Sequence, residues 1–140
     1  MIGEGKNIWP NVHIDEVADL YRTIFDAVIN GAQIGHGRDG YYFGENGEHT
    51  LVDVSKAIGV ALVDAGKAKL AEPTSFTPEE LDKYFGGPGS STGANSRCRA
   101  EHSRAIGWNP VKTTEDMLAS IKPELHAILQ DEKQLNPHGH

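Results

Sequence analysis

The strongest constraint on the fold is a series of amphipathic segments with helical spacing, of which the first three are each bounded by a capping residue and a glycine. In the first, Asp15 precedes apolar residues that recur every three or four positions until Gly31, which predicts a helix over residues 15–30. The apolar positions of this helix are Val17, Leu20, Tyr21, Ile24, Phe25 and Val28. The chain is therefore expected to be mainly helical.

Two more segments begin with clear capping signals. Thr50-Leu51-Val52-Asp53 forms a capping box and opens an apolar stripe that ends at Gly66. Thr77-Pro78-Glu79-Glu80 places a cap, a proline at the first helical position and a glutamate three residues after the cap, and Gly86 stops the helix. We expect a helix in each segment.

The last third of the chain predicts two further helices. Residues 99–106 have the pattern of a short helix, and Thr113-Thr114-Glu115-Asp116 caps a longer one that contains Pro123. Because proline removes a backbone donor and crowds the preceding turn, we expect either a kink at Lys122 or two abutting helices.

Strands and loops complete the predicted organisation. The aromatic run between Gly40 and Gly44 is the best strand candidate, so the fold class is α/β, mainly helical, with about five helices and one or two short strands. The Gly- and Ser-rich residues 86–95 predict a mobile loop, and residues 131–140 a polar frayed tail. At this length we expect a single domain over residues 1–130.

Composition limits the function classes. Thirteen Lys and Arg residues against twenty Asp and Glu residues give a net charge of -7, which argues against nucleic-acid binding. The lone Cys98 cannot form a disulfide within the chain, and neither a signal peptide nor a membrane span is visible. A cytoplasmic protein is the expectation.

The glycines from Gly35 to Gly40 match the dinucleotide fingerprint G-x-G-x-x-G. That fingerprint binds a pyrophosphate only where a strand leads into the N-terminus of a helix, and here a predicted helix precedes it and a predicted strand follows. We interpret the match as turn glycines that coincide with the motif by chance.

Reductases of the short-chain type need a tyrosine followed four residues later by a lysine, and this pair is absent from the sequence. The residues four positions after the four tyrosines are Phe25, Glu45, Asn46 and Pro88. Because no tuned general acid of this kind exists, no catalytic residue is predicted.

Histidine and cysteine chemistry is also weakly supported. A hydrolase or metal enzyme built from His13, Asp15, His49 and His102 would need converging groups at a recognisable spacing, which the sequence does not show. Cys98 has Arg97 and Arg99 as neighbours, which could lower its thiol pKa, but no base partner is identifiable.

Three segments resemble a known family. The run from Asn11 to Tyr21 is similar to the "VHVDDVA" segment of NAD-dependent epimerase/dehydratase proteins, the extended branch of the short-chain dehydrogenase/reductases. Gly40 to Thr50 resembles the strand and capped helix that come next in the family. Residues 95–100 with residues 105–110 resemble its arginine-bearing segment and "LGWxP" turn, in the manner of fungal atypical members.

This resemblance implies the C-terminal, substrate-side portion of a Rossmann-type extended short-chain dehydrogenase/reductase. It implies that Arg97 and Arg99 hold a substrate phosphate or carboxylate, with Asn11 and His13 at the rim of the cleft. A solvated position at the start of a helix is an equally weighted interpretation of the two arginines.

The resemblance implies NAD(P) as the family's cofactor, although none is expected to be bound by this chain alone. We expect a substrate-binding portion for a small molecule that is not catalytic by itself, whether the chain is a fragment, a short gene product or half of a split protein. Apolar faces at Ile8, Trp9, Val12 and residues 41–43 would then lack their partner, which predicts self-association or docking to another chain. The alternative is a small homo-oligomeric interaction protein without enzymatic activity.

Overall fold

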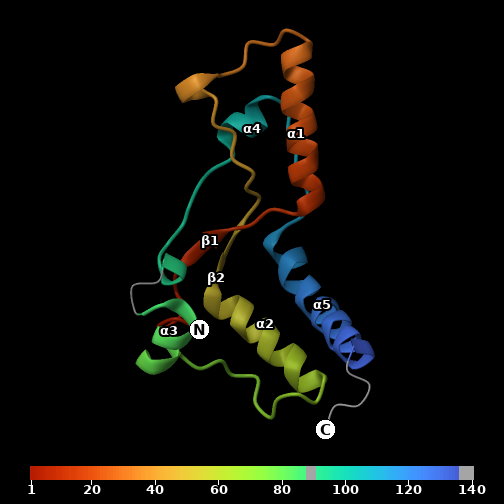
Figure 1. Ribbon diagram of the computed structural model, residues 1–140. Coiled ribbons are helices and arrows are strands. Elements are labelled where there is room, and N and C mark those ends of the chain that lie inside the picture. The colour runs from red at the N-terminus through yellow and green to blue at the C-terminus, as the bar shows by residue number, and fades with distance from the viewer. Residues whose placement is uncertain (88–90, 136–140) are drawn as a thin grey trace. The chain divides into compact units, whose positions relative to one another are not determined.

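A computed structural model describes residues 1–87 and 91–135 (Figure 1). The contacts divide the chain into two compact units, each assembled from separate stretches. The first unit comprises Met1–Ile8, Thr50–Asn95 and Leu118–His140, and the second comprises Trp9–His49 and Ser96–Met117. The residues for which a single domain was expected are thus distributed over two units.

The described residues form five α-helices and one two-stranded sheet, which confirms the mainly helical α/β class. The helices are α1 (Ile14–Ile29), α2 (Leu51–Asp64), α3 (Pro78–Phe85), α4 (Glu101–Ala105) and α5 (Thr114–Leu135). The strands β1 (Ile8–Pro10) and β2 (Glu48–Thr50) pair with each other, and two 3-10 turns, η1 (Gly37–Asp39) and η2 (Ser91–Gly93), complete the elements.

The caps explain where the helices begin and end. The Thr77 side chain accepts from the backbone N–H of Glu80, and the Glu80 carboxylate returns a bond to Thr77, so the predicted capping box of α3 is confirmed. Thr50 caps α2 by accepting from Asp53. For α1 the cap is His13, whose Nδ1 accepts from the backbone N–H of Asp15 at 3.2 Å.

Three sequence predictions are corrected. Residues 41–43 form no strand; the carbonyl of Phe43 instead accepts from the Ser103 hydroxyl at 2.6 Å, so this backbone is bound by α4 rather than by a strand. Helix α4 begins only at Glu101, because Ala100 has a non-helical backbone and its N–H donates to the Glu45 carboxylate. One continuous α5 passes through Pro123, so two abutting helices are wrong.

In the first unit, Ala61 of α2 is fully buried. The chain's first residues lie along residues 74–76, with the Met1 amino group donating to the carbonyl of Thr74 and Phe76 donating back to Met1. Phe76 also contacts the rings of Tyr84 and Phe85 of α3.

The structure describes only part of the glycine-rich loop and of the C-terminal tail. Asn7 donates from its side-chain amide to the carbonyls of Thr92 and Ala94, and Asn95 accepts from Ile8 at 2.7 Å. The remaining loop residues 88–90 lie outside the described residues, and the mobility predicted for 86–95 stays a prediction. Residues 131–135, expected to be frayed, continue α5, and 136–140 are likewise outside the described part.

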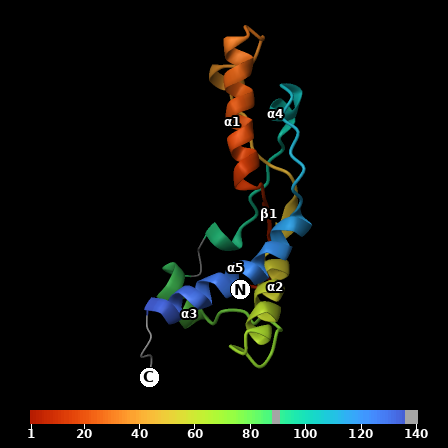
Figure 2. The same cartoon turned by 90° about the vertical axis from the view of Figure 1, so that its right-hand side faces the viewer.

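The second unit is built on α1, with α4 beside it in two views at right angles (Figure 2). Its buried cluster joins Leu20 of α1 to Ala100 and Trp108, with Val12 and Ile24 packed against them. Glu16 is also buried, and its Oε1 accepts from the backbone N–H groups of Val111 and Lys112. This cluster fixes α1 against the segments that carry the candidate site.

Candidate functional site

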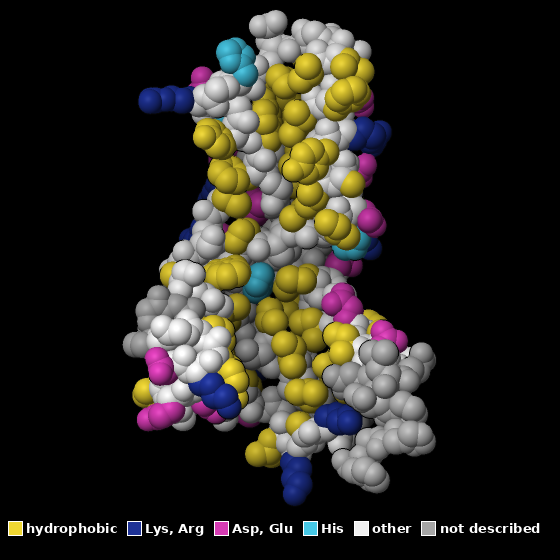
Figure 3. Space-filling model, viewed as in Figure 1, with side chains coloured by type: hydrophobic (Ala, Val, Ile, Leu, Met, Phe, Trp, Pro, Cys, Tyr) yellow, Lys and Arg dark blue, Asp and Glu magenta, His cyan; other side chains and the backbone are white. Residues whose placement is uncertain are grey.

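The second unit contains an apolar cavity of about 850 Å³ along α1. Figure 3 shows hydrophobic side chains gathered around it. Its lining residues are Val17, Leu20, Tyr21, Ile24, Val28, Ala32, Ile34, Gly35, His36, Gly37, Gly40, Tyr42 and Gly44. A pocket of this volume with a mostly apolar wall is typical of a small-molecule site.

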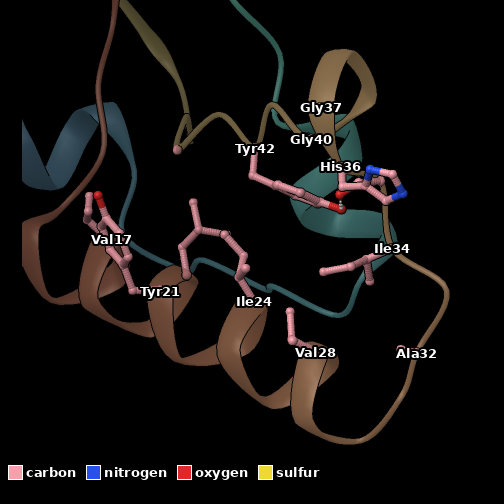
Figure 4. A pocket seen from close by; sticks show the side chains of 13 residues that line it. Val17, Tyr21, Ile24, Val28, Ala32, Ile34, His36, Gly37, Gly40 and Tyr42 are labelled. Atoms are coloured by element: carbon pink, nitrogen blue, oxygen red, sulfur yellow. Dashed lines mark hydrogen bonds between the residues drawn. The ribbon is translucent and has the colours of Figure 1, made fainter.

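Helix α1 supplies one wall because its apolar residues recur at helical spacing. Val17, Ile24 and Val28 rise from the same face of the helix toward the cavity (Figure 4). Leu20 is only 5% exposed, whereas Tyr21 is 73% exposed. The cavity is thus anchored in the core at Leu20 and open to solvent along Tyr21.

Residues 32–44 supply the opposite wall. The Tyr42 hydroxyl donates to the carbonyl of Gly35 at 3.3 Å, which draws this aromatic side chain across the wall (Figure 4). Its ring also meets the edge of His102, with ring centroids 6.0 Å apart. The wall is therefore held in shape by a hydrogen bond and an aromatic contact.

Polar groups are few in this cavity, and three of its lining side chains carry one: Tyr21, His36 and Tyr42. The Tyr42 hydroxyl and the His36 imidazole both belong to the lining, and both were missed as site residues in the sequence. The available signal was the aromatic run at residues 41–43, which we interpreted as a strand. A cavity with this lining suits a mainly apolar molecule that carries one or two hydrogen-bonding groups.

The predicted substrate arginines lie at a second, smaller hollow of about 290 Å³, lined by Glu48, Arg97, Cys98 and Arg99. The Arg97 guanidinium donates from Nε and Nη2 to the two carboxylate oxygens of Glu48, each at 2.7 Å. This bidentate pair holds the pKa of Glu48 below its usual range. Arg97 is therefore already bound within the chain, and Arg99 is exposed at the rim.

The other two predicted residues have structural partners. Asn11 accepts from the Thr114 hydroxyl at 3.0 Å, lies 3.4 Å from His49 Nδ1, and exchanges backbone hydrogen bonds with residues 46 and 47. His13 is the cap of α1 and lies 3.7 Å from the Asp15 carboxylate. Asn11, His13 and Arg97 thus each have different partners within the chain.

Cys98 does not have the electrostatic setting expected from its neighbours. Burial, followed by the carboxylates of Glu45 and Glu48, raises the pKa of the Cys98 thiol above its ordinary value. The expected lowering of the thiol pKa by Arg97 and Arg99 is wrong, because burial disfavours the thiolate, the carboxylates of Glu45 and Glu48 act in the same direction, and Arg97 is paired with Glu48. A thiol in this state is a poor nucleophile at neutral pH.

Metal binding has little geometric support. Within residues 1–87 and 91–135, no group of three His, Cys, Asp or Glu side chains lies close enough together to hold a metal ion. His13 caps α1, His49 lies beside Asn11, and His102 contacts Tyr42. A metal enzyme based on these histidines is therefore not proposed.

The fingerprint glycines do not fit a nicotinamide cofactor. They follow the C-terminus of α1 and contain the three-residue turn η1, so no helix of useful length begins there. A Cβ at Gly35 would lie 2.1 Å from the carbonyl oxygen of Asp39, and one at Gly40 would lie 2.8 Å from His36 Cα. The glycines serve this tight turn rather than a pyrophosphate site.

Comparison with known proteins gives one similarity of note. The chain is 27% identical to "Oxidase ucsJ" of Acremonium sp over 142 aligned residues, which cover 95% of this chain and 39% of that protein. The chain thus spans about two-fifths of the length of this relative. No family model matches the chain, and no solved structure matches it. In the described part, no helix is both long enough and apolar enough to cross a membrane.

Proposed function

We propose that the chain is the substrate-binding portion of an oxidoreductase-like protein of the NAD(P)-dependent epimerase/dehydratase type, the extended branch of the short-chain dehydrogenase/reductases. The observation that carries the proposal is the apolar cavity along α1, which takes up the apolar part of a small substrate. In this proposal the Tyr42 hydroxyl and the His36 imidazole orient a polar group of that substrate.

The comparison with a longer protein supports the oxidoreductase class. Almost the whole chain aligns with part of a relative named an oxidase. The order of elements supports the family: the Asn11 to Tyr21 segment follows strand β1 and opens α1, and β2 leads directly into the capped α2. The same proposal places these elements on the substrate side of a Rossmann-type fold, and it includes a fungal source and a cytoplasmic location.

The proposed role is binding rather than chemistry. The sequence lacks a tyrosine and lysine four residues apart, and the glycines of residues 35–40 do not fit a dinucleotide. Because Arg97 is bound to Glu48, Arg99 is the better candidate for a substrate carboxylate or phosphate. We therefore expect no oxidation of NADH or NADPH by these 140 residues alone.

The second candidate function is a small homo-oligomeric interaction protein without enzymatic activity. The specific observation behind it is the large exposed apolar area of α1, where Tyr21 and Phe25 are 73% and 63% exposed. Saturable binding of an apolar ligand in the cavity would favour the substrate-binding function over the interaction-protein function.

The test is a fluorescence titration of the chain with the neutral apolar dye Nile red. We expect saturable binding with one dye per chain. Val28→Trp fills the cavity and should weaken binding roughly tenfold or more, in keeping with the loss of one well-fitted contact. The matched control is Ile29→Trp, which adds the same side chain one position outside the lining and should leave binding unchanged.

A parallel assay follows the absorbance of NADH and NADPH with the chain and a set of ketones and aldehydes. Oxidation of NADH or NADPH by the purified chain would contradict the proposal that these residues bind substrate without carrying out the chemistry. Dye binding that is unaffected by Val28→Trp would remove the cavity as the site.

A further inference from the structure

One face of α1 carries a stripe of exposed apolar residues, of which Tyr21 and Val28 also line the cavity whereas Ile14 and Phe25 do not. Ile14 is 75% exposed, Tyr21 73%, Phe25 63% and Val28 57%. With the exposed Ala18, these residues are separated by four, three, four and three positions. This is the spacing of the seam of a coiled coil, where two helices pack side by side.

Ile14, Ala18 and Phe25 of the stripe lie outside the face that α1 turns toward its own unit. Leu20 and Ile24 make the contacts with the buried cluster, and they lie about a third of a turn away from Phe25 on the helix. The helix is thus apolar on a broad arc, of which one side is packed and the other is not. An exposed apolar seam over four turns is typical of an interaction surface.

We propose that the seam of α1 is a dimer interface, in which α1 of a second copy of this chain packs antiparallel. In this register Ile14 lies opposite the partner's Phe25, and Ala18 lies opposite the partner's Tyr21, so that a small side chain meets a large one. The pairs occur twice because the interface is symmetric.

Charge at the edge of the seam selects this arrangement. Asp15 and Arg22 are exposed, lie on the same side of the seam and are seven residues apart. Antiparallel packing brings Asp15 near the partner's Arg22 on both copies, whereas in parallel packing the flank with Asp15 and Arg22 faces the opposite flank of the partner and the two residues do not meet. Arg22 already donates to Asp19 at 3.1 Å, and its remaining guanidinium donors leave room for a second carboxylate.

The available area is sufficient for a small dimer. The exposed parts of the seam residues offer roughly 600 Å² per copy, or about 1,200 Å² for the pair, which reaches the lower range of stable interfaces. An anionic membrane surface is a poorer occupant, because the exposed polar side of α1 carries Asp15, Asp19 and Asp26 against a single arginine.

Sedimentation equilibrium of the 140-residue chain between about 1 and 100 µM tests the proposal. We expect a monomer–dimer equilibrium that Phe25→Glu weakens by roughly thirtyfold or more, as for loss of a central anchor. The control Leu70→Glu alters a side chain that is 78% exposed elsewhere and should leave the dimer intact. Circular dichroism verifies that both variants are folded.

A charge-reversal pair tests the orientation. Asp15→Arg and Arg22→Asp should each weaken self-association, while an equimolar mixture of the two variants should restore a heterodimer. A second test uses Cys98→Ser chains carrying Ile14→Cys or Phe25→Cys, which should form a disulfide when mixed and far less when each is oxidised alone. A monomeric wild-type chain at 100 µM, a Phe25→Glu variant that still dimerises, or efficient self-cross-linking of Ile14→Cys would each overturn the proposal.

Discussion

The indole Nε1 of Trp108 donates a hydrogen bond of 2.8 Å to the backbone carbonyl oxygen of Glu16. Trp108 is 3% exposed, and Glu16 is 7% exposed. The Glu16 carboxylate in turn accepts from Val111 at 2.5 Å and from Lys112 at 2.8 Å. The first turn of α1 is therefore joined to the segment after α4 by buried hydrogen bonds, and this junction supports the wall of the cavity.

The first prediction concerns this junction. Trp108→Phe removes the indole donor, leaves the buried carbonyl of Glu16 without it and opens a small void, so the free energy of unfolding should fall by about 1–3 kcal/mol. Urea denaturation followed by circular dichroism measures the change. Val111→Ala, at a side chain that is 70% exposed in the same segment, is the control and should shift the value by less than about 0.5 kcal/mol. Equal losses in the two variants would contradict a structural role for the indole.

The second prediction concerns the ion pair between Arg97 and Glu48. Because the bidentate hydrogen bonds lower the pKa of Glu48 in the folded chain, the pair stabilises the fold fully above the ordinary carboxyl pKa of about 4.3. That stabilisation is lost as the pH falls through the lowered pKa. Arg97→Gln should therefore reduce stability at pH 7 and make little difference near pH 2.

Carbon-13 NMR titration of Glu48 measures the same effect directly. In Arg97→Gln the pKa of Glu48 should return toward its ordinary value. Arg99→Gln is the matched control, because Arg99 acts on Glu48 only through charge at a distance and should shift the pKa less. A larger shift in the control would show that the pairing is misassigned.

The third prediction concerns the packing of α2 in the first unit. Replacing a glycine inside a helix by alanine normally stabilises it by about 1 kcal/mol. At Gly59, however, a Cβ would lie 2.0 Å from the carbonyl oxygen of Ala71. Gly59→Ala should therefore lower the melting temperature by several degrees, consistent with about 1–3 kcal/mol of overpacking. Lys56→Ala, exposed on the same helix, should leave it nearly unchanged, and a more stable Gly59→Ala variant would refute the close approach.

The helices were predictable from the sequence because their signals are local. Capping of α2 by Thr50 and of α3 by Thr77 depends on residues within one turn, and both are confirmed. Strand pairing depends on residues far apart in the sequence, and here the strand prediction was wrong. The aromatic run at residues 41–43 has strand composition, yet β1 pairs with Glu48–Thr50, whose last residue also caps α2.

The candidate site was less predictable for a related reason. Nothing in the sequence indicates that Arg97 and Glu48, 49 residues apart, would satisfy each other. The spacing of α1 did predict an apolar face containing Val17, Ile24 and Val28. The opposite wall could not be predicted, because it depends on how the irregular residues 32–44 fold back onto that face.

The last prediction concerns the reactivity of Cys98. Burial and the nearby carboxylates of Glu45 and Glu48 raise the thiol pKa in the folded chain, so the thiolate fraction at pH 7 is smaller than in an unfolded chain. Alkylation by iodoacetamide should accordingly be slow at pH 7 and should rise with pH, with a midpoint above the ordinary value of about 8.5. The same chain in 6 M urea is the control, with a midpoint near that ordinary value. A native midpoint below the denatured one would mean that the arginines govern this thiol after all, and would restore Cys98 as a candidate nucleophile.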